Sequence, residues 1–315
     1  LVRSRGLGDV YKRQVHKYPN WSQELKNIYD DYPEIKVVFT GSSLLEILNA
    51  RADLSRRAVV YTLQGLSFRE YLELKTGLNL PVLGLDQLLG NHLPIAREIN
   101  SQLKPLHYFE GYLKAGYFPF FLEVPDLYYQ RIEEVINMTL EIELPLLRKV
   151  EVSYVSKLKQ LLQIISESVP FIPNVSKLSE RIGVNRNTFI TYLYYLQEAN
   201  LTRNLYRDAS GITQLQKPDK IYLENTNFQY ALAPTNTEVG AVRETFLANQ
   251  LGYQFRIDYT EQGDFLIDQN YTIEVGGKGK RKQQIQEIPN AYIAADDLEY
   301  GSGTKIPLWM FGFLY

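Results

Sequence analysis

The sequence predicts an α/β protein, and three observations support this fold class. Residues 35–39 form a nearly continuous β-branched and aromatic run, which is typical of a strand buried on both faces of a parallel sheet. Residues 157–168 repeat apolar side chains at helical spacing. Short β-rich segments within 253–275 follow a helical segment at 240–251. Helices and strands therefore alternate along the chain.

The composition excludes several kinds of functional site. The 315 residues include no cysteine, which excludes disulfides, thiol nucleophiles, zinc fingers and iron–sulfur clusters, and only three histidines. Lys and Arg number 34 against 36 Asp and Glu, so bulk charge does not favour nucleic acid, although a local basic face is permitted. No apolar run reaches the ~20 residues of a membrane helix. We therefore expect a soluble protein of the reducing cytoplasm that does not associate with membranes.

Residues 1–14 read as a non-native segment. They carry four basic residues against one acidic residue, and they lack the apolar region of a signal peptide. They resemble translated adapter sequence at the edge of an assembled reading frame, so we exclude them from the prediction of the fold. The chain is then expected to lack a true N-terminal portion, and the alternative is a short native basic arm.

The following residues predict a helix and then a strand. Residues 22–31 place Leu25 and Ile28 one turn apart, with Ser22 as the expected N-cap. The strand within 33–39 precedes small polar residues at the carboxyl end, where ligands bind in parallel sheets. These polar residues are Thr40, Ser42 and Ser43.

Helical segments dominate the chain from residue 44 to residue 130. Residues 44–51 predict a helix and residues 58–63 a second strand. A further helix begins at Ser67, which forms a capping-box pattern with Glu70. Glycine and proline residues interrupt the helices that follow, at Gly77, Pro81, Pro94, Pro105 and Pro119. The aromatic cluster at 112–121 is expected to pack inside.

A second region begins near residue 131. Residues 131–149 and 157–168 predict helices, and two shorter helices within 175–207 flank Gly183. A strand predicted at 220–224 follows them. This order is typical of a winged helix-turn-helix.

The last region begins near residue 236 with a helix at 240–251. Strands are then predicted at 253–257, 264–268, 271–275 and 291–297, with a basic turn at 276–282 and a helix at 283–288. The apolar residues 307–315 predict a buried terminal strand.

Several motifs in this order resemble the prokaryotic ATP-binding proteins of the AAA+ superfamily that carry a C-terminal domain of unknown function. The motifs are VHKYPNW (15–21), FTGSS (39–43), LSRR to LSFREYLEL (54–74), AGYFP (115–119), NTEVGAVRETFLANQL (236–251) and IEVGGKGK (273–280). The resemblance implies a partial P-loop NTPase parallel sheet with a helical lid at 15–130. It also implies a helical linker and winged helix at 131–235, and a small endonuclease-like α/β domain at 236–315.

The same resemblance implies ATP and Mg²⁺ as cofactors of the parent protein, which would hydrolyse ATP. Thr40 or Ser42 would sense the γ-phosphate, and Arg57 would act as an arginine finger on a neighbour's nucleotide in a homo-oligomer. The alternatives are that Thr40 and Ser42 cap a helix, and that Arg56 and Arg57 form a surface pair or a structural salt bridge. His16 would lie beside the nucleotide acids or at the surface.

Two features of the family are absent from the sequence. No G-x-x-x-x-G-K-[ST] loop occurs in the 315 residues, and Arg13 and Gln14 stand where the resemblance implies paired acids. We therefore expect this chain to bind ATP weakly or not at all.

The predicted winged helix offers a candidate nucleic-acid surface. Asn185, Arg186, Asn187 and Thr188, together with Thr191, lie near the start of its second helix, opposite the apolar face. Such side chains can reach base edges or phosphates. The alternative is a protein-binding module, since the surrounding charge is not markedly basic.

The C-terminal region offers a candidate nuclease site. Glu244, Asp264 and Glu274 follow the acid order of restriction-endonuclease-like folds, in which Asp264 and Glu274 would bind Mg²⁺ and a lysine would activate water. The usual lysine position holds Gly276, so Lys278 is the candidate. The alternative is a retained fold without activity, in which Lys278, Lys280, Arg281 and Lys282 form a basic turn for phosphate or a partner.

Overall fold

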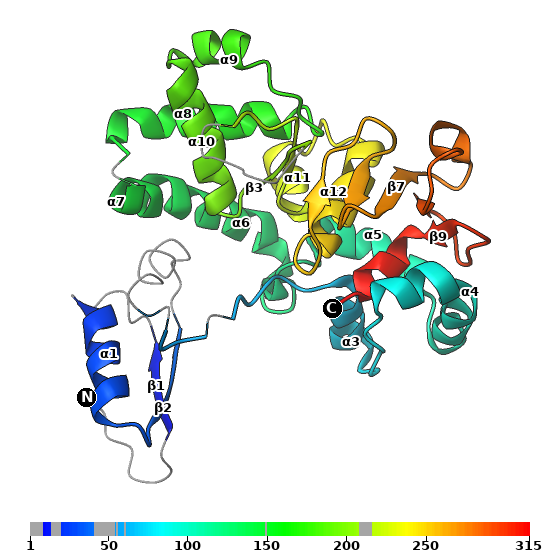
Figure 1. Ribbon diagram of the computed structural model, residues 1–315, viewed down its shortest axis with the longest axis horizontal. Helices are drawn as coiled ribbons and strands as arrows, with labels where there is room; N and C mark the ends of the chain where they lie inside the picture. Colours follow the sequence, from blue (N-terminus) through cyan, green and yellow to red (C-terminus); the bar gives the residue numbers. More distant parts are fainter. Residues whose placement is uncertain are drawn as a thin grey trace.

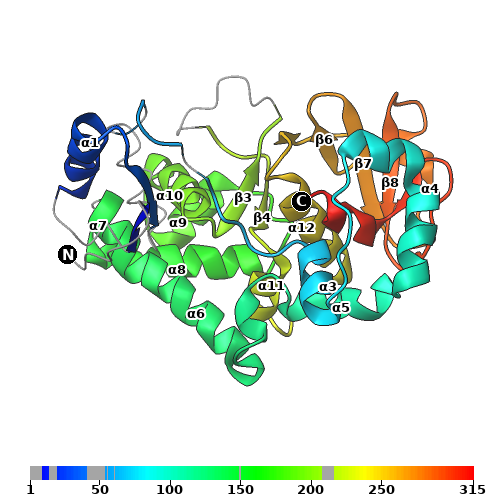
Figure 2. The same cartoon turned by 90° about the horizontal axis from the view of Figure 1, so that it is seen from below.

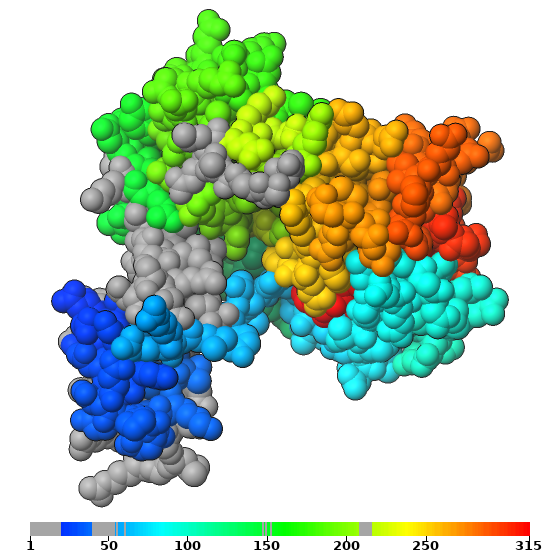
Figure 3. Space-filling view, in the orientation of Figure 1, coloured from blue at the N-terminus to red at the C-terminus, as the bar shows by residue number. Residues whose placement is uncertain are grey.

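The computed structural model describes residues 9–13, 20–40, 54, 56–59, 61–148, 150–207 and 216–315. The protein is a mixed α/β structure with many helices and small sheets, in agreement with the predicted class. An N-terminal unit of β1, α1 and β2 stands apart from the main body, and an extended segment joins it to α3 (Figure 1). The space-filling view shows the same unit projecting from the rest of the molecule (Figure 3).

The N-terminal unit pairs two parallel strands. β1 (Asp9–Arg13) runs beside β2 (Lys36–Thr40), with Arg13 opposite Thr40. Part of the segment 1–14, which we interpreted as non-native, therefore forms a strand. The non-native origin of that segment stays a prediction. The predicted helix is α1 (Trp21–Asp31), and Ser22 is not its N-cap. That position is held by Asn20, with φ 58° and no side-chain cap.

Two further expectations for this region have different outcomes. The helix predicted at 44–51 lies outside the described residues. The strand predicted at 58–63 is wrong for the residues described there, which belong to no strand. Tyr61 and Leu63 are 88% and 100% exposed. A β-rich segment becomes a strand only when another strand accepts its backbone hydrogen bonds, and none in the described chain does so.

Helix α3 begins with the predicted capping box. α3 spans Phe68–Thr76 and ends at Gly77 with φ 73°. The Oγ of Ser67 accepts a hydrogen bond from the Glu70 N–H at 3.2 Å, and the Ser67 N–H donates to the Glu70 carboxylate at 2.9 Å. The capping box thereby satisfies two of the backbone N–H donors that the start of a helix leaves unpaired.

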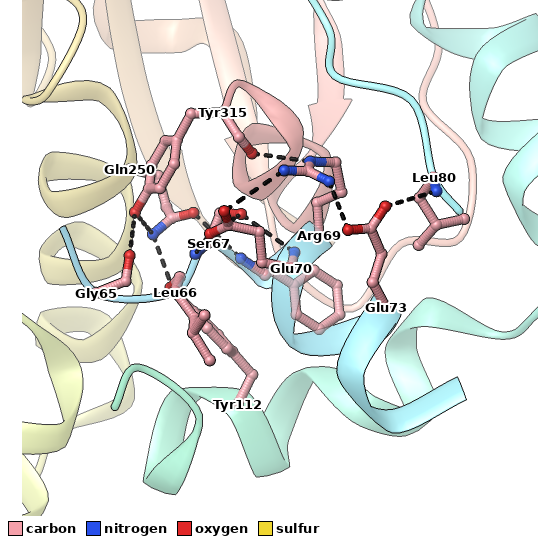
Figure 4. Close-up of polar contacts among 11 residues, drawn as sticks. Gly65, Leu66, Ser67, Arg69, Glu70, Glu73, Leu80, Tyr112, Gln250 and Tyr315 are labelled. Carbon is pink, nitrogen blue, oxygen red and sulfur yellow. Dashed lines mark hydrogen bonds and ion pairs between the residues drawn. The ribbon is translucent and has the colours of Figure 1, made fainter. Parts of the chain in front are cut away.

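The segment that enters α3 is held by parts of the chain distant in sequence (Figure 4). The hydroxyl of Tyr112 donates to the Leu66 carbonyl at 2.7 Å, and the side-chain amide of Gln250 donates to the Tyr112 hydroxyl at 2.9 Å. Arg69 Nε donates to the main-chain oxygen of Tyr315 at 3.0 Å. The start of α3 is therefore fixed to α5, to α12 and to the end of the described chain.

The helices after α3 follow the predicted breaks. α4 spans Leu85–Gln102 and is kinked at Asn91, three residues before Pro94. α5 (Pro105–Ala115) has its proline at the first helical position. Short 3₁₀ helices at Pro119–Phe121 and Pro125–Leu127 follow. Most of the predicted aromatic cluster is buried or packs on the core, including Tyr112, Tyr117 and Phe121.

A long helical run forms the next layer. α6 (Tyr128–Met138) continues through a π-helical turn at Thr139–Glu143 into α7 (Leu144–Arg148). α8 (Val152–Ser166) follows it. The apolar side chains predicted to share one face of α8 are all buried, as the spacing indicated: Leu158, Leu161, Leu162 and Ile165.

Two helices and a hairpin of strands follow α8. α9 (Val175–Ile182) and α10 (Arg186–Glu198) meet at Gly183, which has φ 69°. β3 (Thr202–Leu205) and β4 (Lys220–Leu223) pair antiparallel. The order and the turn agree with the sequence-based expectation. The short helix α11 (Thr226–Leu232) then leads to the C-terminal unit.

The C-terminal unit combines α12 with a mixed five-stranded sheet in sequential order. α12 (Val239–Leu251) contacts β7 and lies beside the sheet (Figure 2). The strands are β5 (Ile257–Asp258), β6 (Phe265–Ile267), β7 (Tyr271–Gly276), β8 (Ala291–Ala295) and β9 (Lys305–Pro307). β5 to β7 are antiparallel neighbours, whereas β7, β8 and β9 are parallel.

Three expectations for this unit are corrected. The strand predicted at 253–257 is reduced to β5, and the helix predicted at 283–288 is a 3₁₀ helix at Lys282–Ile285. The terminal residues predicted as a strand form a 3₁₀ helix at Leu308–Phe313. All six of its residues are buried, so no polar face marks its period, and a short apolar run alone cannot separate strand from helix.

Within the described residues, no helix combines the length and the apolar character needed to cross a membrane.

Candidate functional sites

Of the residues expected to contact nucleotide, Thr40 lies at the end of β2. Thr40 is the last residue of β2 and pairs with Arg13, so β1 and β2 present their carboxyl ends at one edge. Ser42, Ser43 and His16 lie outside the described residues. The structure therefore places the strand ends together, and the sensor role of Thr40 or Ser42 stays a prediction.

Arg57, the candidate arginine finger, binds a carboxylate of the same unit. Its Nε and Nη2 donate to the two carboxylate oxygens of Asp30 at 2.9 and 3.0 Å. This hydrogen bonding raises the pKa of Arg57 and lowers the pKa of Asp30. The forked contact agrees with the structural salt bridge considered above, and a finger role would require Arg57 to leave Asp30.

The predicted nucleic-acid residues line a hollow at the start of α10. The hollow has a volume of about 650 Å³, and its lining includes Asn185, Arg186, Asn187 and Thr188. Asn185 also caps α10, because its Oδ1 accepts a hydrogen bond from the Thr188 N–H at 2.8 Å. Tyr154 of α8 completes part of the wall. The structure thus brings all four predicted residues to one concave surface.

A second hollow lies beside the first one. It has a volume of about 410 Å³ and is lined by residues at the start of α9, by Arg186 and by Lys217. Arg186 belongs to the walls of both hollows. The sequence did not indicate this second hollow, because Lys217 is distant from α9 along the chain.

Each of the three candidate carboxylates of the C-terminal unit lies near a lysine. Glu244 on α12 accepts hydrogen bonds from Lys220 Nζ at 3.1 Å and from the Tyr222 hydroxyl at 2.6 Å. Lys220 Nζ also lies 3.7 Å from an oxygen of Asp264. The ammonium of Lys220 therefore lies between two of the three candidate carboxylates.

Asp264 has a perturbed titration. Burial raises its pKa to about 6, and the charge of Glu244 adds to this effect. The Val275 N–H donates to Asp264 at 2.7 Å, and the charges of Lys220 and Lys280 act in the opposite direction. Such a carboxyl group is a candidate acid–base group because its pKa approaches neutrality.

Glu274 on β7 is paired with Lys280 and not with Lys278. Its Oε1 lies 2.7 Å from Lys280 Nζ, the side chain is 1% exposed, and Oε2 has no hydrogen-bond partner among the described residues. A Cβ at Gly276 would lie only 2.8 Å from the Lys280 side chain. Lys280 thus fills the space beside Gly276, whereas Lys278 pairs with exposed Asp297. Lys280 therefore lies beside Glu274 where Lys278 was expected, and the role of Lys278 as the site lysine stays a prediction.

The described part of the chain contains no group of three His, Cys, Asp or Glu residues able to hold a metal ion. Lys220, Tyr222 and Lys280 contact the candidate acids, and the sequence analysis did not single them out for this. Lys220 and Tyr222 are two residues apart on one strand, so the sequence could predict that they share a face of the sheet. The sequence could not predict their contact with α12, because that contact depends on how the hairpin packs.

A buried ion pair lies where the β3–β4 hairpin meets the end of α12. Arg203 on β3 pairs with Glu224, and their side chains are 17% and 6% exposed. The Tyr253 hydroxyl donates to Glu224 at 2.9 Å, and Arg203 donates to the carbonyl of Gly252 at 3.0 Å. The hairpin is therefore fixed against the end of α12.

Comparison with known proteins assigns a class to the N-terminal part of the chain. Residues 14–72 match the family described as AAA domain. Residues 106–238 match a domain of unknown function, DUF8612. The expected similarity to AAA-type ATPases is therefore supported for residues 14–72. Neither match reaches residues 239–315, so their likeness to endonucleases stays a prediction.

A curated relative is the uncharacterized protein MJ1637 of Methanocaldococcus jannaschii. It is 25% identical to this chain over 309 residues, which cover 91% of the chain and 65% of the relative. No solved structure matches the chain.

Proposed function

We propose that residues 15–130 hold the later part of the nucleotide-binding unit of an ATP-hydrolysing AAA-type protein. The position of Thr40 carries this proposal, because Thr40 ends β2 at the carboxyl edge of a strand that has a parallel neighbour. Ligands bind at this edge in parallel sheets. The similarity of residues 14–72 to AAA domains supports the same assignment.

In this proposal each candidate residue has a separate role. Thr40 or Ser42 contacts the γ-phosphate of Mg-ATP, and Arg57 stabilises charge on a nucleotide bound by a neighbouring copy. Arg57 must first exchange Asp30 for phosphate oxygens, which bind a guanidinium in the same forked geometry. The active form is then a homo-oligomer.

The chain itself is proposed to bind Mg-ATP weakly. Its 315 residues contain no phosphate-binding G-x-x-x-x-G-K-[ST] loop. Isothermal titration of the purified chain with Mg-ATP is expected to give a dissociation constant of about 1 mM or weaker, equivalent to about −4 kcal/mol. A micromolar constant would contradict this part of the proposal.

The arginine-finger role is tested in an ATP-hydrolysing form of the chain that is extended by a phosphate-loop segment. Replacing Arg57 by alanine is expected to lower kcat for ATP hydrolysis by about 10³-fold, the lower end of the range for arginine fingers. Arg56→Ala is the matched control and should retain most of the activity. Equal losses from both substitutions would indicate a structural role for the pair.

A second candidate function is nucleic-acid binding by α9, α10, β3 and β4 as a winged helix. The observation that favours it is the hollow at the start of α10, which gathers Asn185 to Thr188. Affinity for DNA is expected to fall steeply with salt, since phosphate contacts release counterions. Binding that does not change with salt, or no binding, would favour the protein-contact alternative.

The acids of the C-terminal unit support a weaker proposal of Mg²⁺-dependent phosphodiester cleavage at Asp264 and Glu274. Lys280 would take the lysine role, because it lies 2.7 Å from Glu274. Against it, Lys220 already neutralises Glu244 and lies near Asp264. Plasmid nicking with Mn²⁺ that disappears in Glu274→Ala would support cleavage. Equal nicking by the unmodified chain and by Glu274→Ala would indicate a contaminating nuclease.

A further inference from the structure

The two hollows at the starts of α9 and α10 share one cation in their walls. Their volumes are about 650 and 410 Å³, and Arg186 lies in the wall of each. Among the described residues Arg186 forms no ion pair, and it is exposed. Its guanidinium is therefore available at the boundary between two cavities, each large enough for a small ring system.

The walls of the larger hollow combine aromatic rings with hydrogen-bonding groups. Tyr154, Tyr192 and Tyr195 supply rings, and Asn187 and Thr188 supply polar groups. A planar, polar ring system is the ligand that such a lining suits, because it can stack on tyrosine while its edge forms hydrogen bonds.

The smaller hollow adds charge at the opposite side of Arg186. Lys217 is exposed in its wall, next to Pro173, Asn174 and Ser176 of the segment that leads into α9. Two cations therefore follow one another along the surface, with a cavity on each side of the first. The order of hollow, Arg186 and hollow matches the alternation of bases and phosphates along a strand, in which Arg186 would meet the phosphate between two bases.

We propose that these hollows are a binding track for single-stranded nucleic acid, with one base in the larger hollow and Arg186 on the adjoining phosphate. The proposal rests on nucleic-acid binding as the second candidate function and goes beyond it by naming the strand form. Bases in a duplex are stacked and paired inside the helix, so they reach a cavity only after leaving the stack. An unpaired strand enters without that cost.

The test is fluorescence anisotropy of the whole chain with a fluorescein-labelled deoxythymidine oligonucleotide. The same oligonucleotide in duplex form and free AMP are the competing ligands. The single strand is expected to bind at least about tenfold more tightly than the duplex, since only an unpaired base can stack on the tyrosine rings of the larger hollow. AMP should compete only at far higher concentration, because it lacks the second phosphate and the second base.

Two substitutions that are expected to change the affinity in opposite directions test the position of the binding track. Arg186→Ala is expected to weaken binding about tenfold and to reduce the slope of log affinity against log salt by about 0.7, the contribution of one single-strand phosphate. Glu151→Gln removes an acidic side chain from the larger hollow and is expected to strengthen binding. A variant that merely damages folding cannot strengthen binding. Arg181→Ala, on α9 but outside both hollows, is the matched control and should match the unmodified chain.

Each outcome distinguishes the proposals. Tighter binding to the duplex would overturn the single-strand track and leave the winged-helix proposal standing. No binding to either form would overturn both, without bearing on the AAA-type proposal. Equal losses from Arg186→Ala and Arg181→Ala would place the nucleic acid elsewhere on the surface.

Discussion

The two sheets at the ends of the chain contain similar apolar strands, yet they are covered very differently. In the N-terminal sheet Val38 lies at the centre of β2 and is 55% exposed. In the C-terminal sheet Phe265, Ile273 and Ala294 are fully buried. Both sheets include parallel pairing. In the N-terminal sheet Trp21 of α1 packs against Phe39 of β2, with ring centroids 5.7 Å apart, whereas the face that carries Val38 has no comparable cover among the described residues.

This difference shows that an apolar run predicts a strand without predicting its cover. Parallel strands are stable when both faces are buried, and a two-stranded sheet buries little surface of its own. The C-terminal sheet gains its cover from α12 and from the 3₁₀ helix at Leu308–Phe313. We therefore expect the free energy of unfolding to depend on the main body and only slightly on β1 and β2.

The largest expected effect compares two apolar substitutions. Phe246 on α12 is 1% exposed, and its ring meets those of Phe109 and Tyr112 edge-on. Phe246→Ala should lower the free energy of unfolding by about 3–5 kcal/mol, since it leaves a cavity. Val38→Ala should change it by less than about 0.5 kcal/mol. Urea unfolding followed by circular dichroism measures both, and equal losses would break the comparison.

The next effect compares two ion pairs, one in each region. Glu224→Gln leaves the buried guanidinium of Arg203 without its counter-charge and should cost about 3 kcal/mol of unfolding free energy. Asp30→Asn removes the partner of Arg57 in the N-terminal unit, where water screens both groups. Its effect on the main unfolding transition should be too small to detect. A clear loss in Asp30→Asn would show that the N-terminal unit unfolds together with the body.

A pH effect of intermediate size sharpens the description of the body. The pKa of Asp264 is raised from 3.8 to about 6, so between those values the folded state holds a proton that the unfolded state releases. Protonation of Asp264 therefore makes the folded state more stable as pH falls through about 6. Above that pH the ionised carboxylate lowers the free energy of unfolding by its full amount. Asp264→Asn should stabilise the protein at neutral pH by at most about 3 kcal/mol, since one pKa unit corresponds to about 1.4 kcal/mol. Chemical unfolding at several pH values measures this effect. If the free energy of unfolding depends on pH equally in Asp264→Asn and in the unmodified chain, the raised pKa of Asp264 is excluded.

His92 changes the stability of the folded state with pH in the opposite direction to Asp264, over the same pH range. Burial lowers its pKa, so below about 6.5 the unfolded chain binds a proton that the folded chain does not. Stability from this group falls as pH falls, and His92→Leu should remove that loss while Asp264→Asn should not. The two variants therefore separate contributions that partly cancel in the unmodified chain.

The sequence predicted local structure well and tertiary contacts poorly. The faces of α8 and α10 and the capping box at Ser67 depend on residues within a few turns, and their spacing was sufficient. The terminal 3₁₀ helix was missed because burial on every side removes the polar period.

The candidate sites show the same limit. Asn185 to Thr188 were predicted together because they are adjacent on one helix. Lys280 lies beside Glu274, where Lys278 was expected, because the turn after Gly276 folds back over Glu274, and residue spacing does not encode that geometry. Lys220 reaches Glu244 only through the packing of the hairpin on α12, which no local pattern indicated.

The smallest expected effect compares the residues that begin α3 and α1. The Ser67 hydroxyl accepts a hydrogen bond from the Glu70 N–H, so Ser67→Ala should lower the free energy of unfolding by about 1 kcal/mol. Ser67→Thr keeps the hydroxyl and should restore most of that loss. Asn20 precedes α1 with φ 58° and no side-chain hydrogen bond to the helix. Asn20→Gly should therefore leave α1 intact or slightly more stable, because glycine adopts positive φ without strain. Hydrogen exchange at the amides of both helices measures the two effects separately. Faster exchange in α1 after Asn20→Gly would mean that the asparagine side chain stabilises that helix, and the contrast between the two regions would not extend to their helix starts.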